Sequence, residues 1–254
     1  MSDTLLEIDD LSVGIEEGDI LHNINIKIAP GETHVLMGPN GAGKSTLGNT
    51  LMGNPMYQVR SGHIFFDGQD ITYESVDKRA RAGMFMSFQN PLEVPGLSLE
   101  AFIRNAIRQK TGQPIKIFQF KKQLEKTMEI LGIDPSYAER DLNVGFSGGE
   151  KKKAEILQML MLNPRFCILD ETDSGLDVDA VRTVSRGIEE YQKNSDGALL
   201  IITHNAKILE ALNVDYTHII VKGRIVLTGG PELIDIISEQ GFERFTEGDE
   251  GSDE

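Results

Sequence analysis

The sequence predicts an α/β fold whose core sheet is mostly parallel, with antiparallel strands near the N-terminus and an inserted helical subdomain. Three observations predict this fold class. The apolar strand 34–37 leads directly into a glycine-rich loop and then into a helix. Apolar residues between about 98 and 162 recur with helical periodicity, and the last third of the chain returns to alternating strands and helices.

The N-terminal region is rich in strands. Ile24, Ile26 and Ile28 alternate with polar residues, which is the period of a half-buried strand. Residues 63–67 predict a second strand, because a turn with Gly follows them. Residues 82–88 are apolar on both faces, which predicts a strand in the interior of the sheet.

The middle and C-terminal regions complete the expected organisation. Helical periodicity across 97–163 predicts the inserted subdomain, so residues 1–96 and 164–246 together form the α/β core. In that core, the continuous apolar run 198–203 is typical of a strand covered on both faces. The acidic segment 247–254 has no apolar residue to bury, and we expect a disordered tail there.

Composition and charge exclude several classes of protein. The chain has 254 residues, a formal net charge of −15, and 26% charged and 39% hydrophobic residues, as expected of a globular protein. No apolar run approaches the ~20 residues that cross a bilayer, and the acidic N-terminus is unlike a signal peptide. We therefore expect a cytoplasmic protein without direct membrane insertion. The negative charge also disfavours a nucleic acid partner, and Cys167, in an apolar run, is expected to be a small core residue.

The glycine-rich loop has the spacing G-x-x-x-x-G-K-S of the phosphate-binding loop of P-loop NTPases. Glycines let the backbone wrap closely round an anion, and the amides of the following helix point toward it. Lys44 then supplies positive charge to the β- and γ-phosphates, and the Ser45 hydroxyl is placed to ligate Mg²⁺. The predicted nucleotide site consists of Gly38, Pro39, Asn40, Gly41, Ala42, Gly43, Lys44, Ser45 and Thr46.

Two acidic residues end the apolar strand near residue 168. Asp170 and Glu171 should reach the carboxyl edge of the sheet, beside the phosphate-binding loop. We predict that Asp170 holds Mg²⁺, directly or through water, and that Glu171 polarises the attacking water, a role worth ~10²–10⁴ in rate. Two acids alone can equally begin a surface loop. The phosphate-binding loop is what favours the catalytic interpretation.

The segment Ser147–Glu150, Ser-Gly-Gly-Glu, allows two interpretations. As local structure it is a capping box, in which Ser147 caps a helix and Glu150 reaches back to the cap. As a functional element it exposes backbone amides to a phosphate at a helix N-terminus. Both can hold together, because a ligand can use the amides that the cap leaves free.

Residues 146–150, Phe-Ser-Gly-Gly-Glu, resemble the signature motif of the ABC ATPases. The resemblance extends to Gln89 as the Q-loop glutamine, to residues 174–177 as the D-loop and to His204 as the switch histidine. It implies ATP hydrolysis, with Gln89 reaching the metal and the attacking water and His204 contacting the γ-phosphate. The implied catalytic residues are Lys44, Gln89, Glu171 and His204, and the implied metal ligands are Ser45, Gln89 and Asp170.

The same resemblance implies that two copies share each site. In ABC ATPases the signature motif of one subunit closes over ATP held by the phosphate-binding loop of another. This implies a transient, ATP-dependent head-to-tail homodimer, in which Ser147, Gly148 and Gly149 contact the nucleotide. The sequence departs from the family pattern at the aromatic that usually stacks on adenine, where it has Ile15, and at the fifth signature residue, where Glu150 replaces the usual Gln.

Four longer segments resemble most closely the SufC-type ATPases of the Suf iron–sulfur cluster assembly system; they are residues 37–41, 88–96, 143–153 and 170–177. This resemblance implies that SufB- and SufD-type scaffold proteins are the partners. It also implies that the coupling surface lies around residues 89–96 and the first helices of the helical subdomain.

Two other functions remain open on the sequence. The nucleotide-binding subunit of a membrane ABC transporter shares every catalytic motif and differs in its partner. A nucleotide-gated structural switch with negligible turnover is the other alternative, and an intact Glu171 and His204 argue against it.

Overall fold

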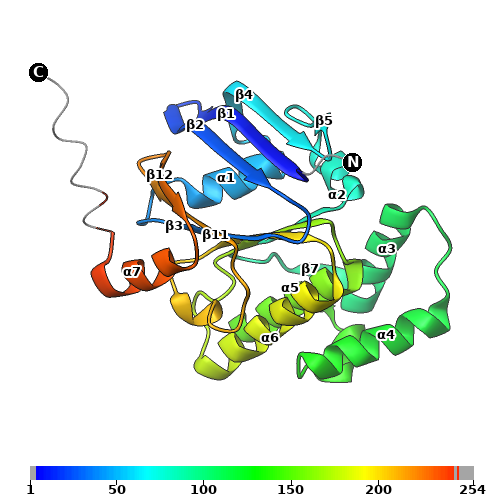
Figure 1. Cartoon of the computed structure of the whole chain (residues 1–254). Coiled ribbons are helices and arrows are strands. Elements are labelled where there is room, and N and C mark those ends of the chain that lie inside the picture. Colours follow the sequence, from blue (N-terminus) through cyan, green and yellow to red (C-terminus); the bar gives the residue numbers. More distant parts are fainter. Residues whose placement is uncertain (1–3, 243–244, 246–254) are drawn as a thin grey trace, which may run out of the picture.

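Two sheets and a set of helices make up the fold (Figure 1). The computed structural model describes residues 4–242 and 245, so the predicted acidic tail 247–254 lies outside the described residues. One sheet is mostly parallel and carries the phosphate-binding loop, whereas the other is antiparallel and contains the N-terminal strands. This arrangement confirms the predicted fold class.

Six strands form the core sheet in the order β12-β11-β3-β10-β9-β6. All neighbouring pairs from β11 to β6 are parallel, and β12 runs antiparallel to β11. Ile202 of β10 lies opposite both Leu36 of β3 and Asp170 of β9, so these three strands end at the same edge. The bounds are β3 Thr33–Met37, β6 Met84–Ser87, β9 Phe166–Asp170, β10 Ala198–Ile202, β11 Tyr216–Val221 and β12 Arg224–Gly229.

The place of β6 in the sheet corrects the prediction for residues 82–88. The strand pairs with β9 on one side and is an edge strand, not an interior one. Met84 and Met86 are nevertheless buried, because α2 (Val76–Ala82) and α5 (Gly148–Leu162) contact the strand. Apolar residues on both faces of a strand indicate that other elements cover both faces. They do not indicate whether the strand has neighbouring strands on one side or on two.

The antiparallel sheet covers the helix that follows the phosphate-binding loop. Its order is β2-β1-β4-β5, and α1 (Lys44–Leu51) lies between it and the core sheet (Figure 1). Leu47 of α1, Ile8 of the antiparallel sheet and Ile168 of the core sheet belong to one buried apolar cluster. The strands are β1 Leu6–Ile15, β2 Gly18–Ile28, β4 Gln58–Phe66 and β5 Gln69–Asp70.

The remaining helices pack on the opposite face of the core sheet. A second apolar cluster joins Ile103, Leu124 and Leu157 from helices to Leu169 and Leu199 from the sheet. The elements are β7 Val94–Ser98, α3 Leu99–Thr111, α4 Ile117–Ile130, η1 Pro135–Glu139, β8 Asp141–Leu142, α5, α6 Val178–Asn194, η2 Ala206–Ile208 and α7 Glu232–Gln240.

Two further expectations concern burial. Cys167 is fully buried in β9, and burial raises the pKa of its thiol to about 12, so it is a small core residue as predicted. Across residues 4–242 and 245, none of the helices has the length and apolar character needed to cross a membrane.

Candidate nucleotide-binding and catalytic site

The phosphate-binding loop joins β3 to α1 in a conformation that its glycines permit. Gly41 and Gly43 have φ values of 79° and 101°, in the left-handed region that disfavours residues with a Cβ. Gly43 is the N-cap of α1, and no side chain caps this helix. The backbone amides at the start of α1 therefore remain free for a phosphate.

Lys44 lies against the carbonyl groups of its own loop. Its Nζ donates to the carbonyl oxygens of Gly38, at 2.8 Å, and Pro39, at 3.0 Å, and the residue is buried. Burial lowers the pKa of Lys44, and the carboxylates of Glu171 and Asp170 act in the opposite direction. The ammonium group is thus held at the loop, where phosphate oxygens could replace the two carbonyls as acceptors.

Asp170 meets Ser45 where β9 ends beside the loop. The Ser45 hydroxyl donates to Asp170 Oδ1 at 3.1 Å. Burial raises the pKa of Asp170, the hydrogen bond from Ser45 opposes this shift, and the charge of Glu171 adds to it.

These two side chains suit Mg²⁺. A hydroxyl and a carboxylate are the hard oxygen donors that this ion prefers, and water and nucleotide phosphates usually fill its other positions. Within the described part of the chain, no group of three or more His, Cys, Asp or Glu side chains could hold a metal alone.

Glu171 lies between two polar side chains that come from other strands. Its Oε2 accepts a hydrogen bond of 2.6 Å from Gln89 Nε2, after β6, and its Oε1 lies 3.6 Å from His204 Nδ1, after β10. The backbone of Glu171 has a φ of 46°, and its N–H donates to Ile202 at 2.9 Å. A non-glycine residue rarely adopts this conformation, so the fold fixes where the carboxylate points.

A cavity of about 690 Å³ brings together most of the predicted residues of the phosphate-binding half of the site, whereas Gly38, Pro39 and Ala42 do not line it. Asp170 lies behind it, in contact with Ser45. The cavity is lined by Ile20, Asn40, Gly41, Gly43, Lys44, Ser45, Thr46, Gln89, Glu171, Ser174 and His204.

The signature segment lies elsewhere. Ser147, Gly148 and Gly149 are absent from the lining of that cavity, and Ser147 and Gly148 are exposed. The predicted capping box is present: the Ser147 hydroxyl accepts from the Glu150 N–H at 3.3 Å, and the Glu150 carboxylate accepts from the Ser147 N–H at 2.7 Å. Glu150 also accepts a hydrogen bond from the Tyr137 hydroxyl. Its carboxylate is thereby engaged by the cap, and one chain by itself does not bring the signature segment to the phosphate-binding loop.

Sequence reasoning missed several contributors to the site. Ile20 lines the cavity, whereas Ile15, which stands at the position of the family's usual adenine-stacking aromatic, does not. Both residues flank the turn between β1 and β2, and the sequence could not say which one faces the loop. The buried Thr203 hydroxyl also donates to Asp173 at 3.0 Å, which ties the segment after β9 to the end of β10. The sequence signal that could have identified Thr203 is its position directly before His204.

Comparisons with known proteins agree with this geometry. Residues 21–174 match the family model described as ABC transporter. Vegetative protein 296 of Bacillus subtilis is 44% identical over 245 residues, which cover 96% of this chain and 94% of that protein. A probable ATP-dependent transporter of Synechocystis is 43% identical over 251 residues, which cover 97% of this chain and 98% of that protein.

A solved structure shares the fold. The ATP-binding cassette MJ0796, in a dimeric post-hydrolysis state bound to ADP and Pi, matches with a TM-score of 0.77 over 89% of this chain and 98% of that chain. At 17% identity this likeness concerns the fold alone. The family model and the two relatives establish the family. The chain belongs to the ABC transporter family, and it is an ATPase built on the nucleotide-binding cassette of that family.

Proposed function

We propose that this chain hydrolyses MgATP to drive a conformational change of a SufB/SufD-type scaffold in iron–sulfur cluster assembly. The observation that carries the catalytic part is the position of Glu171, which lies between Gln89 and His204 at the cavity of the phosphate-binding loop. Phosphoryl transfer requires a clamped phosphate and an oriented water more than covalent chemistry. In this proposal Lys44 and the amides of α1 clamp the phosphate, and Glu171 orients the water.

Each residue has a role that follows from its surroundings. Lys44 exchanges its carbonyl partners for phosphate oxygens, and the free amides of α1 bind the same group. Ser45 and Asp170 would hold Mg²⁺, with Gln89 as the third predicted ligand, and the ion would neutralise phosphate charge. Glu171 accepts a hydrogen bond from the attacking water, while Gln89 and His204 keep its carboxylate in place.

The outward position of Ser147–Gly149 supports a shared site. These residues are separate from the cavity in their own chain, and the N-terminus of α5 can receive a phosphate from outside. We infer a head-to-tail homodimer that forms with ATP and separates after hydrolysis, and a monomer at rest.

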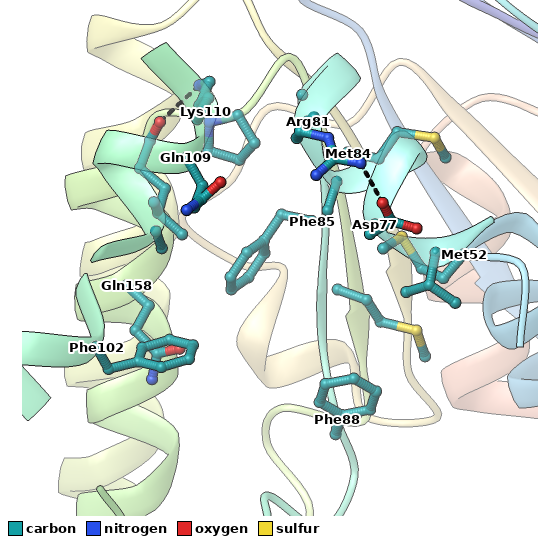
Figure 2. Close-up of a pocket in the computed structure, with 17 residues that line it drawn as sticks. Met52, Asp77, Arg81, Met84, Phe85, Phe88, Phe102, Gln109, Lys110 and Gln158 are labelled. Carbon is teal, nitrogen blue, oxygen red and sulfur yellow. Dashed lines mark hydrogen bonds and ion pairs between the residues drawn. The ribbon is translucent and has the colours of Figure 1, made fainter. Parts of the chain in front are cut away.

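An apolar groove supports a partner surface next to Gln89. The groove has a volume of about 540 Å³ and lies between α2, β6, α3 and α5. Figure 2 shows Phe85, Phe88 and Phe102 around it. Phe88 is 53% exposed, and Leu92 in the adjoining segment is 81% exposed. Large exposed apolar side chains close together are typical of a protein-binding site. The groove is lined by residues of α3, which belongs to the expected coupling surface, and by Phe88, which directly precedes residues 89–96.

The choice of partner rests on the resemblance of residues 88–96 and 143–153 to SufC-type ATPases. A scaffold of this kind, in the cytoplasm, is the partner we propose. The second candidate is a membrane transporter subunit, because the Synechocystis relative is named a probable ATP-dependent transporter. Both partners could use the same groove and the same catalytic residues.

Affinity purification of the tagged chain from soluble and membrane fractions of its own cells, with mass spectrometry, tests the choice. We expect SufB- and SufD-like proteins in the soluble fraction. Recovery of a polytopic membrane protein would instead make the chain a transporter subunit. Phe88→Ala should lose the partner, whereas Val226→Ala should retain it, because Val226 is 46% exposed on β12, at the opposite edge of the core sheet from β6 and outside the groove.

A further inference from the structure

Two opposite charges are buried side by side on α5. Lys152 and Glu155 are each 4% exposed, and Lys152 Nζ lies 3.5 Å from Glu155 Oε2. Most other buried residues of this helix are apolar, such as Ile156 and Leu157. Burying an ion pair costs desolvation energy that a well-packed apolar pair avoids, so packing alone does not account for these residues.

The pair holds both backbone polar groups of Phe88. Glu155 Oε1 accepts a hydrogen bond of 2.8 Å from the Phe88 N–H, and Lys152 Nζ donates to the Phe88 carbonyl oxygen. Strand β6 ends at Ser87, so Phe88 has already left the hydrogen-bond ladder with β9. At Phe88 the backbone is therefore held by hydrogen bonds to side chains of α5, in place of hydrogen bonds to β9.

Phe88 connects this hold to the catalytic site. The next residue, Gln89, donates to Glu171 Oε2 at 2.6 Å. The other end of the connection is α5, which begins at the signature segment Ser147–Gly149. A continuous series of contacts thus runs from the helix of the signature segment, through the backbone of Phe88 and the side chain of Gln89, to Glu171.

The side chain of Phe88 belongs to the apolar groove (Figure 2). The same residue therefore presents its ring to the groove and its backbone to the charged pair of α5.

We propose that Lys152 and Glu155 are positioning residues that set Gln89 on Glu171 by holding the backbone of Phe88. The proposal rests on the roles proposed above for Gln89 and Glu171. Burial raises the pKa of Glu155, and Lys152 and the Phe88 N–H oppose this shift. The carboxylate thus depends on both partners to remain charged.

The double variant Lys152→Met/Glu155→Leu tests the proposal. It removes both charges at similar volume, an exchange that is often neutral or stabilising for a buried pair. The substitutions also leave the Phe88 N–H and carbonyl oxygen without their partners, so we expect a melting temperature a few degrees lower. At a temperature where the variant is folded, we expect unchanged ATP affinity and a kcat that falls about tenfold or more, since small displacements of catalytic groups have such costs. Lys153→Met removes a charge from the same helix and should leave kcat unchanged. A double variant with the kcat of the wild type overturns the proposal.

A double-mutant cycle with Gln89→Ala tests the route. If the pair acts through Gln89, the Lys152→Met/Glu155→Leu substitutions should cause little further loss of kcat in the Gln89→Ala background. Lys152 also lowers the pKa of Asp170. If the double variant still lowered kcat by the full factor in the Gln89→Ala background, the loss would come from the effect of the Lys152 charge on Asp170. The proposal would then fail.

A measurement without turnover separates this proposal from the proposed function. We expect the NMR signal of the Gln89 side-chain amide to shift in the double variant and in Glu171→Gln, and to stay in place in Lys153→Met. An unmoved signal in the double variant overturns the inference, whatever the turnover. Absence of hydrolysis in the wild type would contradict the proposed function and leave this result to decide the inference.

Discussion

The N-termini of α1 and α5 are two glycine-rich helix starts with different designs. Helix α1 begins at Gly43, in a left-handed conformation and without a side-chain cap. Helix α5 begins at Ser147 with a complete capping box to Glu150. The first terminus leaves its amides to a ligand, whereas the second is stabilised by its own side chains. The chain therefore has one terminus that needs an anion and one that is stable before an anion arrives.

Their surroundings differ in the same direction. Lys44 beside the α1 terminus is 5% exposed and lies next to Ser45, Asp170 and Glu171, whereas Ser147 and Gly148 are exposed. A buried charged site must be assembled by the fold, because each charge needs its partners within the protein. An exposed loop does not need such partners within the chain, because water solvates its polar groups. The difference is consistent with our proposal that the α1 terminus binds the nucleotide and the α5 terminus completes the site of another copy.

The largest expected effect lies on the α1 side. Glu171→Gln keeps the shape of the side chain and removes the charge that polarises water, so turnover should fall by ~10²–10⁴. ATP binding should persist, because Lys44 and the amides of α1 are untouched. Phosphate release at saturating ATP and titration with a fluorescent nucleotide measure the two quantities. An unchanged rate would remove Glu171 from the mechanism.

A comparison of Lys44→Ala with Ser147→Ala separates binding from completion. Lys44→Ala removes a charged donor to phosphate, and the affinity of one chain for ATP should fall by about a hundredfold. Ser147→Ala should leave that affinity within about twofold and lower turnover, because its loop acts on another copy. Equal losses of affinity would mean that both termini bind the same nucleotide within one chain.

Low pH should destabilise the core sheet at β3, the strand that leads into the phosphate-binding loop. His34 on β3 and His218 on β11 are buried, with 2.9 Å between their ring nitrogens, and burial lowers the pKa of His218 to about 4, with the charge of His34 adding to the shift. Between pH 6.5 and about 4 the unfolded chain therefore binds more protons than the folded chain. The free energy of unfolding should decrease as the pH is lowered through this window, by roughly 1.4 kcal/mol per pH unit.

Denaturant unfolding at several pH values measures this slope. His218→Gln should flatten it, while substitution of His63 should not, because that histidine is exposed. A slope that survives His218→Gln would place the acid-sensitive group elsewhere.

The smallest effect is expected on the α5 side. Ser147→Ala removes a side-chain cap and should lower the free energy of unfolding by about 1 kcal/mol. Helix α1 has no comparable side chain to lose. Chemical denaturation with and without nucleotide measures the change. The absence of any loss would mean that Glu150 alone supports the terminus.

The sequence by itself determined the features that depend on neighbouring residues. The phosphate-binding loop, the acids at the end of β9 and the capping box of α5 were predicted, because their geometry follows from local backbone conformation and fixed spacing. Alternation in β2 and the apolar run of β10 likewise reported burial correctly.

Tertiary structure decided what depends on packing between distant segments. It placed β6 at the edge of the sheet, brought Ile20 rather than Ile15 to the cavity, and set Lys152 and Glu155 on the backbone of Phe88. No local pattern distinguishes a buried charged side chain that hydrogen-bonds the backbone of a distant segment from a solvated side chain in a run of lysines. The physical reason is that spacing along the chain fixes which groups are neighbours within a turn, whereas contacts across the fold exist only once the layers have packed.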